Sequence, residues 1–94
     1  MVRLQFYGTL RLALSGREYA ELPWQEGDTV ASLLERFQAT ERVPVTGKLF
    51  SGDNLLHIGT IILLNRRNIL HLDKLETEVK DGDVLALFPP GAGG

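Results

Sequence analysis

Apolar and polar residues alternate along the start of the chain. Residues 2–7 carry apolar side chains at positions 2, 4 and 6, with Arg3, Gln5 and Tyr7 between and after them. Successive side chains of a strand point to opposite faces of a sheet, so this pattern predicts a half-buried strand. After a turn signal at Ser15-Gly16, residues 18–24 predict a second strand that pairs with the first as a hairpin.

A helical spacing follows the second strand. Val30, Leu33, Leu34 and Phe37 recur at i, i+3, i+4 and i+7. That spacing is typical of a helix with one face on a core. The preceding pair Asp28-Thr29 contains the expected N-cap, because both residue types accept hydrogen bonds from the first free backbone N–H groups of a helix.

The second half of the chain predicts further strands. After a loop-rich stretch over residues 44–59, the aliphatic run 61–64 predicts a strand buried on both faces or nearly so, and residues 69–72 are a shorter strand candidate. The turn signature Asp81-Gly82-Asp83 then marks the start of a final strand over residues 84–88. Alternation in that strand places positions 85 and 87 on one face and Ala86 and Phe88 on the other.

This order of elements predicts an α+β domain. The expected architecture is a mixed sheet with the helix across one face, and with the last strand beside the first and parallel to it. The 94 residues are enough for one small domain with a single core. We expect the domain to cover residues 1–88 and a flexible tail to cover residues 89–94.

The tail has a composition suited to handling by other proteins. Two prolines end the strand at Phe88 and favour an extended path away from the sheet. Glycines without side chains would allow a narrow channel to close around the backbone. We therefore expect Gly94 to supply the working carboxylate, and the residues that a partner recognises to be Pro89, Pro90, Gly91, Ala92 and Gly93. The alternative is an ordinary frayed terminus, which explains mobility but not the paired glycines.

Composition narrows the classes of function. Hydrophobic residues make up 44% of the chain, charged residues 23%, and the net charge is −2, which indicates an ordinary soluble domain without a basic nucleic-acid surface. The absence of cysteine excludes disulfides and a cysteine nucleophile and is compatible with a reducing compartment, so the cytoplasm is the expected location. Neither a signal peptide nor a membrane-spanning segment is expected.

Side-chain constellations for catalysis or metal binding are weak. His57 and His71 lack neighbours at a metal-ligand spacing, so no metal site is expected. Residues 51, 53 and 57 (Ser, Asp and His) crowd into one loop without a nucleophile elbow. Arg66-Arg67 is typical of a solvated turn, or of a contact with an acidic partner surface.

One pair of aromatic residues remains as a candidate interface. Strand parity places Tyr7 and Phe88 on the side of the sheet opposite Phe6, so they share one open face if the first and last strands are neighbours. We predict that this pair contacts a partner. The alternative is that a loop covers it.

Several of these motifs together resemble the ubiquitin-like β-grasp sulfur carriers. The chain is most similar to the small subunit of molybdopterin synthase (MoaD-like), with ThiS as a more distant relative. The resemblance covers most of the chain and is carried by residues 2–14 with Leu10-Arg11, Gly16, Thr29-Val30-x-x-Leu33-Leu34, Asn65, Asp81-Gly82-Asp83-Val84, and Phe88-Pro89-Pro90 through Gly93-Gly94. The chain departs from the pattern at Asn65-Arg66-Arg67-Asn68 and in the extra residues 68–74.

The resemblance implies a carrier that is a substrate of other enzymes. An E1-like enzyme would adenylate Gly94 with ATP, and a persulfide donor would convert the product to a thiocarboxylate. The sulfur would pass to a pterin precursor on a large, MoaE-like synthase subunit that supplies the basic pocket and the catalytic lysines. The chain itself would bind no cofactor, nucleic acid or membrane.

Other destinations for the activated terminus stay open at this point. They are tungstopterin synthesis, thiamine or cysteine synthesis, and conjugation to lysines as a ubiquitin-like modifier. An unrelated interaction domain with a flexible tail is a further alternative.

Overall fold

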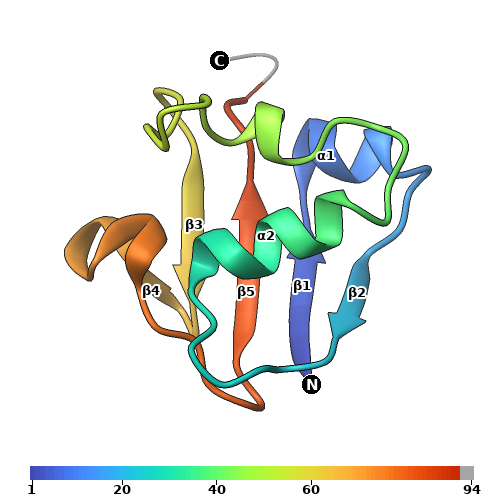
Figure 1. The fold of residues 1–94 in the computed structure, drawn as a ribbon. Coiled ribbons are helices and arrows are strands. Elements are labelled where there is room, and N and C mark those ends of the chain that lie inside the picture. Colours follow the sequence, from blue (N-terminus) through green and yellow to red (C-terminus); the bar gives the residue numbers. More distant parts are fainter. Residues whose placement is uncertain (92–94) are drawn as a thin grey trace.

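A five-stranded mixed sheet forms the framework of the molecule (Figure 1). The computed structural model describes residues 1–91. The strand order is β2-β1-β5-β3-β4, with β1 and β5 parallel and the other neighbours antiparallel. The elements are β1 (Val2–Phe6), α1 (Gly8–Ala13), β2 (Tyr19–Leu22), α2 (Val30–Gln38), η1 (Thr46–Lys48), β3 (Ile61–Leu64), β4 (Arg67–Asn68), η2 (Ile69–His71), η3 (Lys74–Glu76) and β5 (Val84–Phe88), where η denotes a 3-10 helix.

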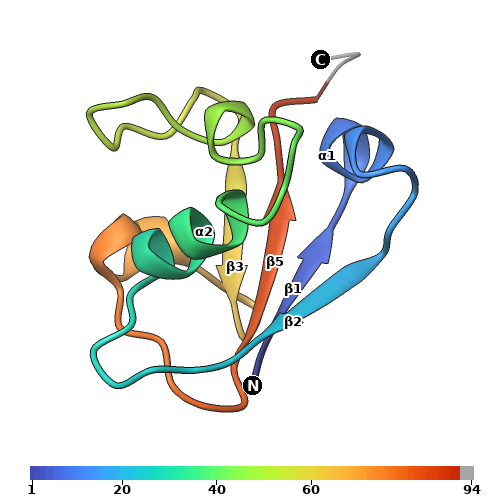
Figure 2. The same cartoon turned by 45° about the vertical axis from the view of Figure 1, so that its right-hand side comes forward.

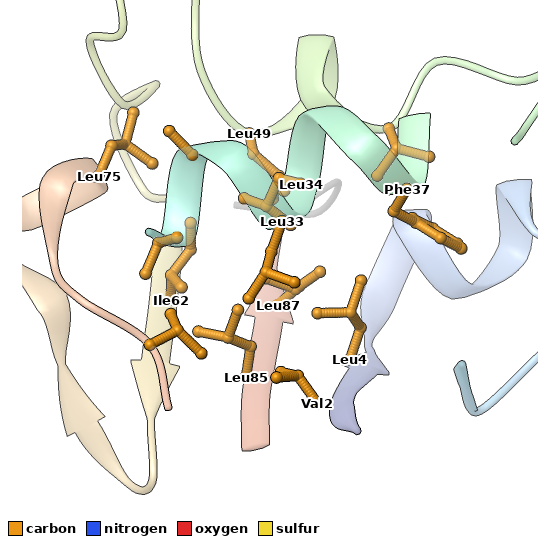
Figure 3. Close-up of a cluster of buried hydrophobic side chains, with 14 of the residues drawn as sticks. Val2, Leu4, Leu33, Leu34, Phe37, Leu49, Ile62, Leu75, Leu85 and Leu87 are labelled. Atoms are coloured by element: carbon orange, nitrogen blue, oxygen red, sulfur yellow. The ribbon is translucent and has the colours of Figure 1, made fainter. Parts of the chain in front are cut away.

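The main helix α2 lies across one face of the sheet, as predicted (Figures 1 and 2). Its apolar face is buried against the inward side chains of the central strands, and Phe37 stacks on Phe6 with ring centroids 5.3 Å apart. Burying each large aliphatic side chain stabilises the fold by about 1.5 to 3 kcal/mol. Figure 3 shows the cluster, which includes Val2, Leu4, Leu33, Leu34, Phe37, Leu49, Ile62, Leu75, Leu85 and Leu87.

This topology confirms the predicted ubiquitin-like β-grasp architecture. The parallel pairing of the first and last strands is present, with Leu4 opposite Leu85. The inward positions of both strands are the predicted ones, because Val2, Leu4 and Phe6 are buried in β1 and Leu85 and Leu87 in β5.

Thr29, and not Asp28, is the N-cap of α2. The Thr29 side chain accepts a hydrogen bond from the backbone N–H of Ser32, and the Ser32 side chain accepts one from the backbone N–H of Thr29. Asp28 instead forms a bidentate ion pair with Arg36, two turns along the helix, with both nitrogen–oxygen distances 2.9 Å. Arg36 also donates to the carbonyl oxygen of Pro23 at 2.7 Å, so the pair fixes the loop between β2 and α2.

The Asp28 ion pair predicts a loss of stability in acid. The Arg36 hydrogen bonds, helped by those from Gln25 and Ser32 and opposed by burial, lower the pKa of Asp28 from 3.8 to about 2. A lowered pKa in the folded state means that the carboxylate stabilises the fold above its unfolded pKa, and that this contribution disappears as the pH falls from about 4 to about 2. The shift corresponds to about 2 kcal/mol.

We therefore expect Asp28→Asn to lower the free energy of unfolding by about 2 kcal/mol at neutral pH, and the deficit to shrink towards zero near pH 2. Urea unfolding of both proteins at neutral pH and in acid measures this difference. Asp53→Asn is the matched control, because that carboxylate bonds Ser51 but lies on the surface and should change stability little. A deficit independent of pH would contradict the role assigned to Asp28.

Three sequence-based predictions of local structure were wrong. The predicted antiparallel pairing of the first two strands is confirmed, but residues 8–13 between them form the helix α1, and β2 is shorter than the predicted residues 18–24. Residues 69–71 form a 3-10 helix instead of a strand, and the side chain of Asn68 caps its first turn by accepting from Leu70 N–H. The strand β3 is buried on one face only, because Ile61 is 44% exposed.

The helix α1 ends in a Schellman motif that lacks the usual glycine. The N–H groups of Ser15 and Gly16 donate to the carbonyl oxygens of Leu12 and Arg11, respectively. This is the Schellman arrangement, with Ser15 at φ 60° in the position that glycine usually occupies. The Ser15-Gly16 signal was therefore the stop of a helix and not the turn of a hairpin.

Candidate functional site

The central strand β5 carries the chain to one edge of the molecule (Figure 1). The strand ends at Phe88, as the prolines predicted. Pro89 is buried, Pro90 is half-buried and Gly91 is exposed. The first two residues of the expected tail are therefore packed on the domain. Ala92, Gly93 and Gly94, with the predicted mobility and carboxylate, lie outside the described residues.

Two glycines from distant parts of the chain pack against the prolines. Gly8 begins α1 at φ +58°, and a Cβ built on it would lie 3.9 Å from Cγ and Cδ of Pro89. Gly59 has φ +91°, and its Cβ would lie 3.6 Å from Cα and Cβ of Pro90. Both separations are ordinary contacts, so the positive φ angles, and not lack of space, favour glycine here. We call Pro89, Pro90, Gly8 and Gly59 the tail root.

Tyr7 and Phe88 lie side by side on the face of the sheet opposite α2. Their ring centroids are 4.3 Å apart and their planes differ by 8°, so the rings stack. Tyr7 is 36% exposed and Phe88 is half-buried. The structure thus brings the two predicted residues together, and no loop within residues 1–91 closes over them, because a hollow of about 550 Å³ opens beside them.

The hollow widens the surface that the sequence indicated. Besides the two rings it is lined by Gln5, Leu63, Asn65, Arg66, Val84 and Ala86. Ile61 pairs with Phe88 and Leu63 with Ala86 across β3 and β5, so the outward side chains of β3 extend the apolar surface. The prediction that β3 is buried on both faces missed these outward side chains. Strand parity together with the β3–β5 register would have identified them. We call the outward side chains of β1, β3 and β5 the open face.

One end of the open face is basic. Asn65 and Arg66 form the two-residue turn between β3 and β4, with φ 49° and 72°. The Asn65 amide donates to Asp83 Oδ1 at 2.8 Å, and its oxygen accepts from the Val84 N–H at 2.9 Å, which ties the turn to the start of β5. Within residues 1–91, no carboxylate lies within ion-pair distance of Arg66. The hollow therefore combines apolar walls with a cationic rim.

The other candidate groups are engaged in local structure. Ser51 donates to Asp53, but the Nε2 atom of His57 lies 2.8 Å from the carbonyl oxygen of Gly47, so the three side chains do not form a proton relay. Across the described part of the chain, no cluster of three His, Cys, Asp or Glu side chains is arranged to hold a metal ion. Over the same residues, no helix has the length and apolar character needed to cross a membrane.

Comparison with known proteins identifies a family to which the chain belongs. Residues 4–94 match the ThiS family. The chain is 32% identical over 96 residues to small archaeal modifier protein 3 of Haloferax volcanii, and the match covers 99% of this chain and 98% of that protein.

Two solved structures show the same fold over nearly their whole length. A chain in the crystal structure of the Amycolatopsis orientalis BexX/CysO complex superposes with a TM-score of 0.83 and 26% identity, and the match covers 100% of both chains. A Pyrococcus furiosus protein, provisionally described as molybdopterin converting factor subunit 1, superposes with a TM-score of 0.70 and 25% identity over 95% of each chain.

Proposed function

Because the chain belongs to the ThiS family and has the fold of its ubiquitin-like sulfur carriers, we propose that its C-terminal glycine is an acyl carrier for sulfur. A partner adenylates the Gly94 carboxylate with ATP, and a persulfide donor converts the adenylate to a thiocarboxylate. The observation that carries this proposal is the position of the tail root, which directs Gly91 outwards from the central strand beside the open face.

The chemistry of the terminus requires a partner. An α-carboxyl group with a pKa of about 3.3 to 3.7 is an anion at neutral pH and therefore a poor electrophile. Its oxygen attacks the α-phosphorus of ATP, pyrophosphate leaves, and the resulting acyl adenylate is open to attack. A persulfide sulfur then displaces AMP, and a thiol cleaves the acyl disulfide to leave the thiocarboxylate and a disulfide.

Two uses of the activated terminus have specific support. Likeness to the Pyrococcus furiosus protein favours transfer of sulfur to a pterin precursor, in molybdopterin or tungstopterin synthesis, on a MoaE-like subunit. The 32% sequence identity with the Haloferax volcanii modifier protein favours conjugation of the terminus to lysines. Both uses begin with the same adenylate, so adenylation of Gly94 is common to the two, and only the sulfur transfer distinguishes the carrier from the modifier.

Thiol labelling and intact mass distinguish these uses. The chain contains no cysteine, so in protein purified from its native cells iodoacetamide finds no thiol except a C-terminal thiocarboxylate. Replacement of one oxygen by sulfur at Gly94, with rapid labelling, would support the carrier role. Isopeptide-linked ladders on lysines would support the modifier role. An unmodified terminus in cells with an active sulfur pathway would argue against both.

A further inference from the structure

Two large apolar side chains are exposed on the segments that contain the glycines of the tail root. Ile58 is 99% exposed and Leu12 is 77% exposed. The open face does not include them, because Ile58 precedes β3 in a loop and Leu12 lies on α1. Single exposed apolar residues are common on protein surfaces, but two at one feature call for a physical reason.

Both residues lie on segments that border the end of β5. Leu12 lies about one turn beyond Gly8 on α1, and a Cβ built on Gly8 would lie 3.9 Å from two ring atoms of Pro89. Ile58 is the chain neighbour of Gly59, and a Cβ built on Gly59 would lie 3.6 Å from Cα and Cβ of Pro90. Figures 1 and 2 both show the end of β5 leaving between α1 and the loop before β3. Leu12 and Ile58 therefore belong to the two segments between which β5 ends.

The length of the tail restricts what can cover these residues. Beyond Gly91 the chain has three residues, which span at most about 10 to 11 Å when fully extended. An enzyme that holds Gly94 in its active site must therefore bring the mouth of its channel to within about that distance of the tail root. At so close an approach, the mouth of the channel comes near the two segments that carry Leu12 and Ile58.

We propose that Leu12 and Ile58 form an exit collar that packs against an apolar rim around the tail-binding channel of the activating enzyme. This inference rests on the proposed function. The collar is separate from the open face and acts at the moment of tail insertion, since burying its two side chains holds the tail root at a fixed depth. Its effect is therefore expected in the reaction of the bound tail as well as in binding.

The test uses the same substitution at three exposed positions. Leu12→Gln and Ile58→Gln remove the apolar collar. Leu70→Gln is the matched control, because Leu70 is 49% exposed on η2, beyond the edge strand β4 and away from the tail root. ATP–pyrophosphate exchange with the purified E1-like adenylating enzyme of the same organism measures kcat/KM for each variant, and thermal unfolding checks the fold.

We expect each collar substitution to lower kcat/KM by about 5- to 30-fold, the double variant to lower it by about 100-fold or more, and the control to stay within about twofold. All variants should unfold like the wild type.

A double variant as active as the wild type would overturn the collar, while the proposed function would stand on the wild-type activity. Absence of exchange with the wild type would instead overturn the proposed function and the collar with it. Collar-dependent dimers in sedimentation, with unchanged exchange, would assign the surface to a second copy of the chain and overturn the proposal.

Discussion

Deleting Gly94, or adding one alanine after it, is expected to abolish adenylation and sulfur acceptance while the domain stays folded. The reacting group is the main-chain carboxylate, and no side chain can replace it at the end of the chain. One residue moves that carboxylate by about 3.3 Å, and misplacement by about 1 Å already reduces rates by about 100-fold, so we expect a loss of at least about 1,000-fold. Pyrophosphate exchange and intact mass after incubation with ATP and the persulfide donor measure it.

A Gly93→Ala variant is the matched control for the terminus. It keeps the length and the carboxylate but adds one methyl group inside the partner's channel, so its activity should lie between those of the wild type and the Gly94 deletion. Far-UV circular dichroism and urea unfolding should give the same result for all four proteins. If the chain with the extra alanine accepted sulfur without being trimmed, the terminal carboxylate of Gly94 would not be the acceptor.

Truncating the open-face ring in Phe88→Ala is expected to weaken partner binding by about 1 to 4 kcal/mol and to cost less stability than truncation of a core ring. Phe88 is half-buried and stacks on Tyr7, so loss of the stack should lower the free energy of unfolding by only about 0.5 to 1.5 kcal/mol beyond the lost area. Titration calorimetry with the activating enzyme, beside urea unfolding of the free chain, separates the two effects.

The buried ring of Phe6 is the control, because its truncation should reduce stability and leave partner binding unchanged. Phe6 is 1% exposed beneath α2, and Phe6→Ala should lower the free energy of unfolding by about 3 to 5 kcal/mol, with binding per folded molecule unchanged. If Phe88→Ala behaved like Phe6→Ala, the ring would belong to the core. The open face would then not be the docking surface.

The parts of the fold that the sequence predicted are those with a strong local period. Alternation in β1 and β5 assigned every inward side chain, and the helical spacing from Val30 to Phe37 located α2. Because the first and last strands lie side by side, that alternation also located the stacked pair of Tyr7 and Phe88. Parity within two strands was enough for this part of the site.

The remaining features depend on contacts that no local pattern encodes. The helix α1 is short, and the left-handed position after its last turn is occupied by Ser15 instead of the usual glycine. The sequence around it therefore resembled a turn. The outward position of Ile61 follows from its pairing with Phe88, and an uninterrupted aliphatic run has no period to reveal which side is open. The two glycines of the tail root, Gly8 and Gly59, come from opposite halves of the chain and come near Pro89 and Pro90 only when the sheet is complete.

The central parallel pair also determines when during synthesis the molecule becomes usable. In β1, Arg3 pairs with Val84 of β5, so the innermost ladder of the sheet has a very high contact order. A nascent chain whose last strand is still inside the ribosome cannot form that ladder, and its core lacks Leu85 and Leu87. The strand that completes folding is also the strand that presents the tail and Phe88. Under the proposed function, a partner enzyme that binds the open face would therefore select completed molecules, and truncated or unfolded copies would be excluded from activation without a separate inspection step.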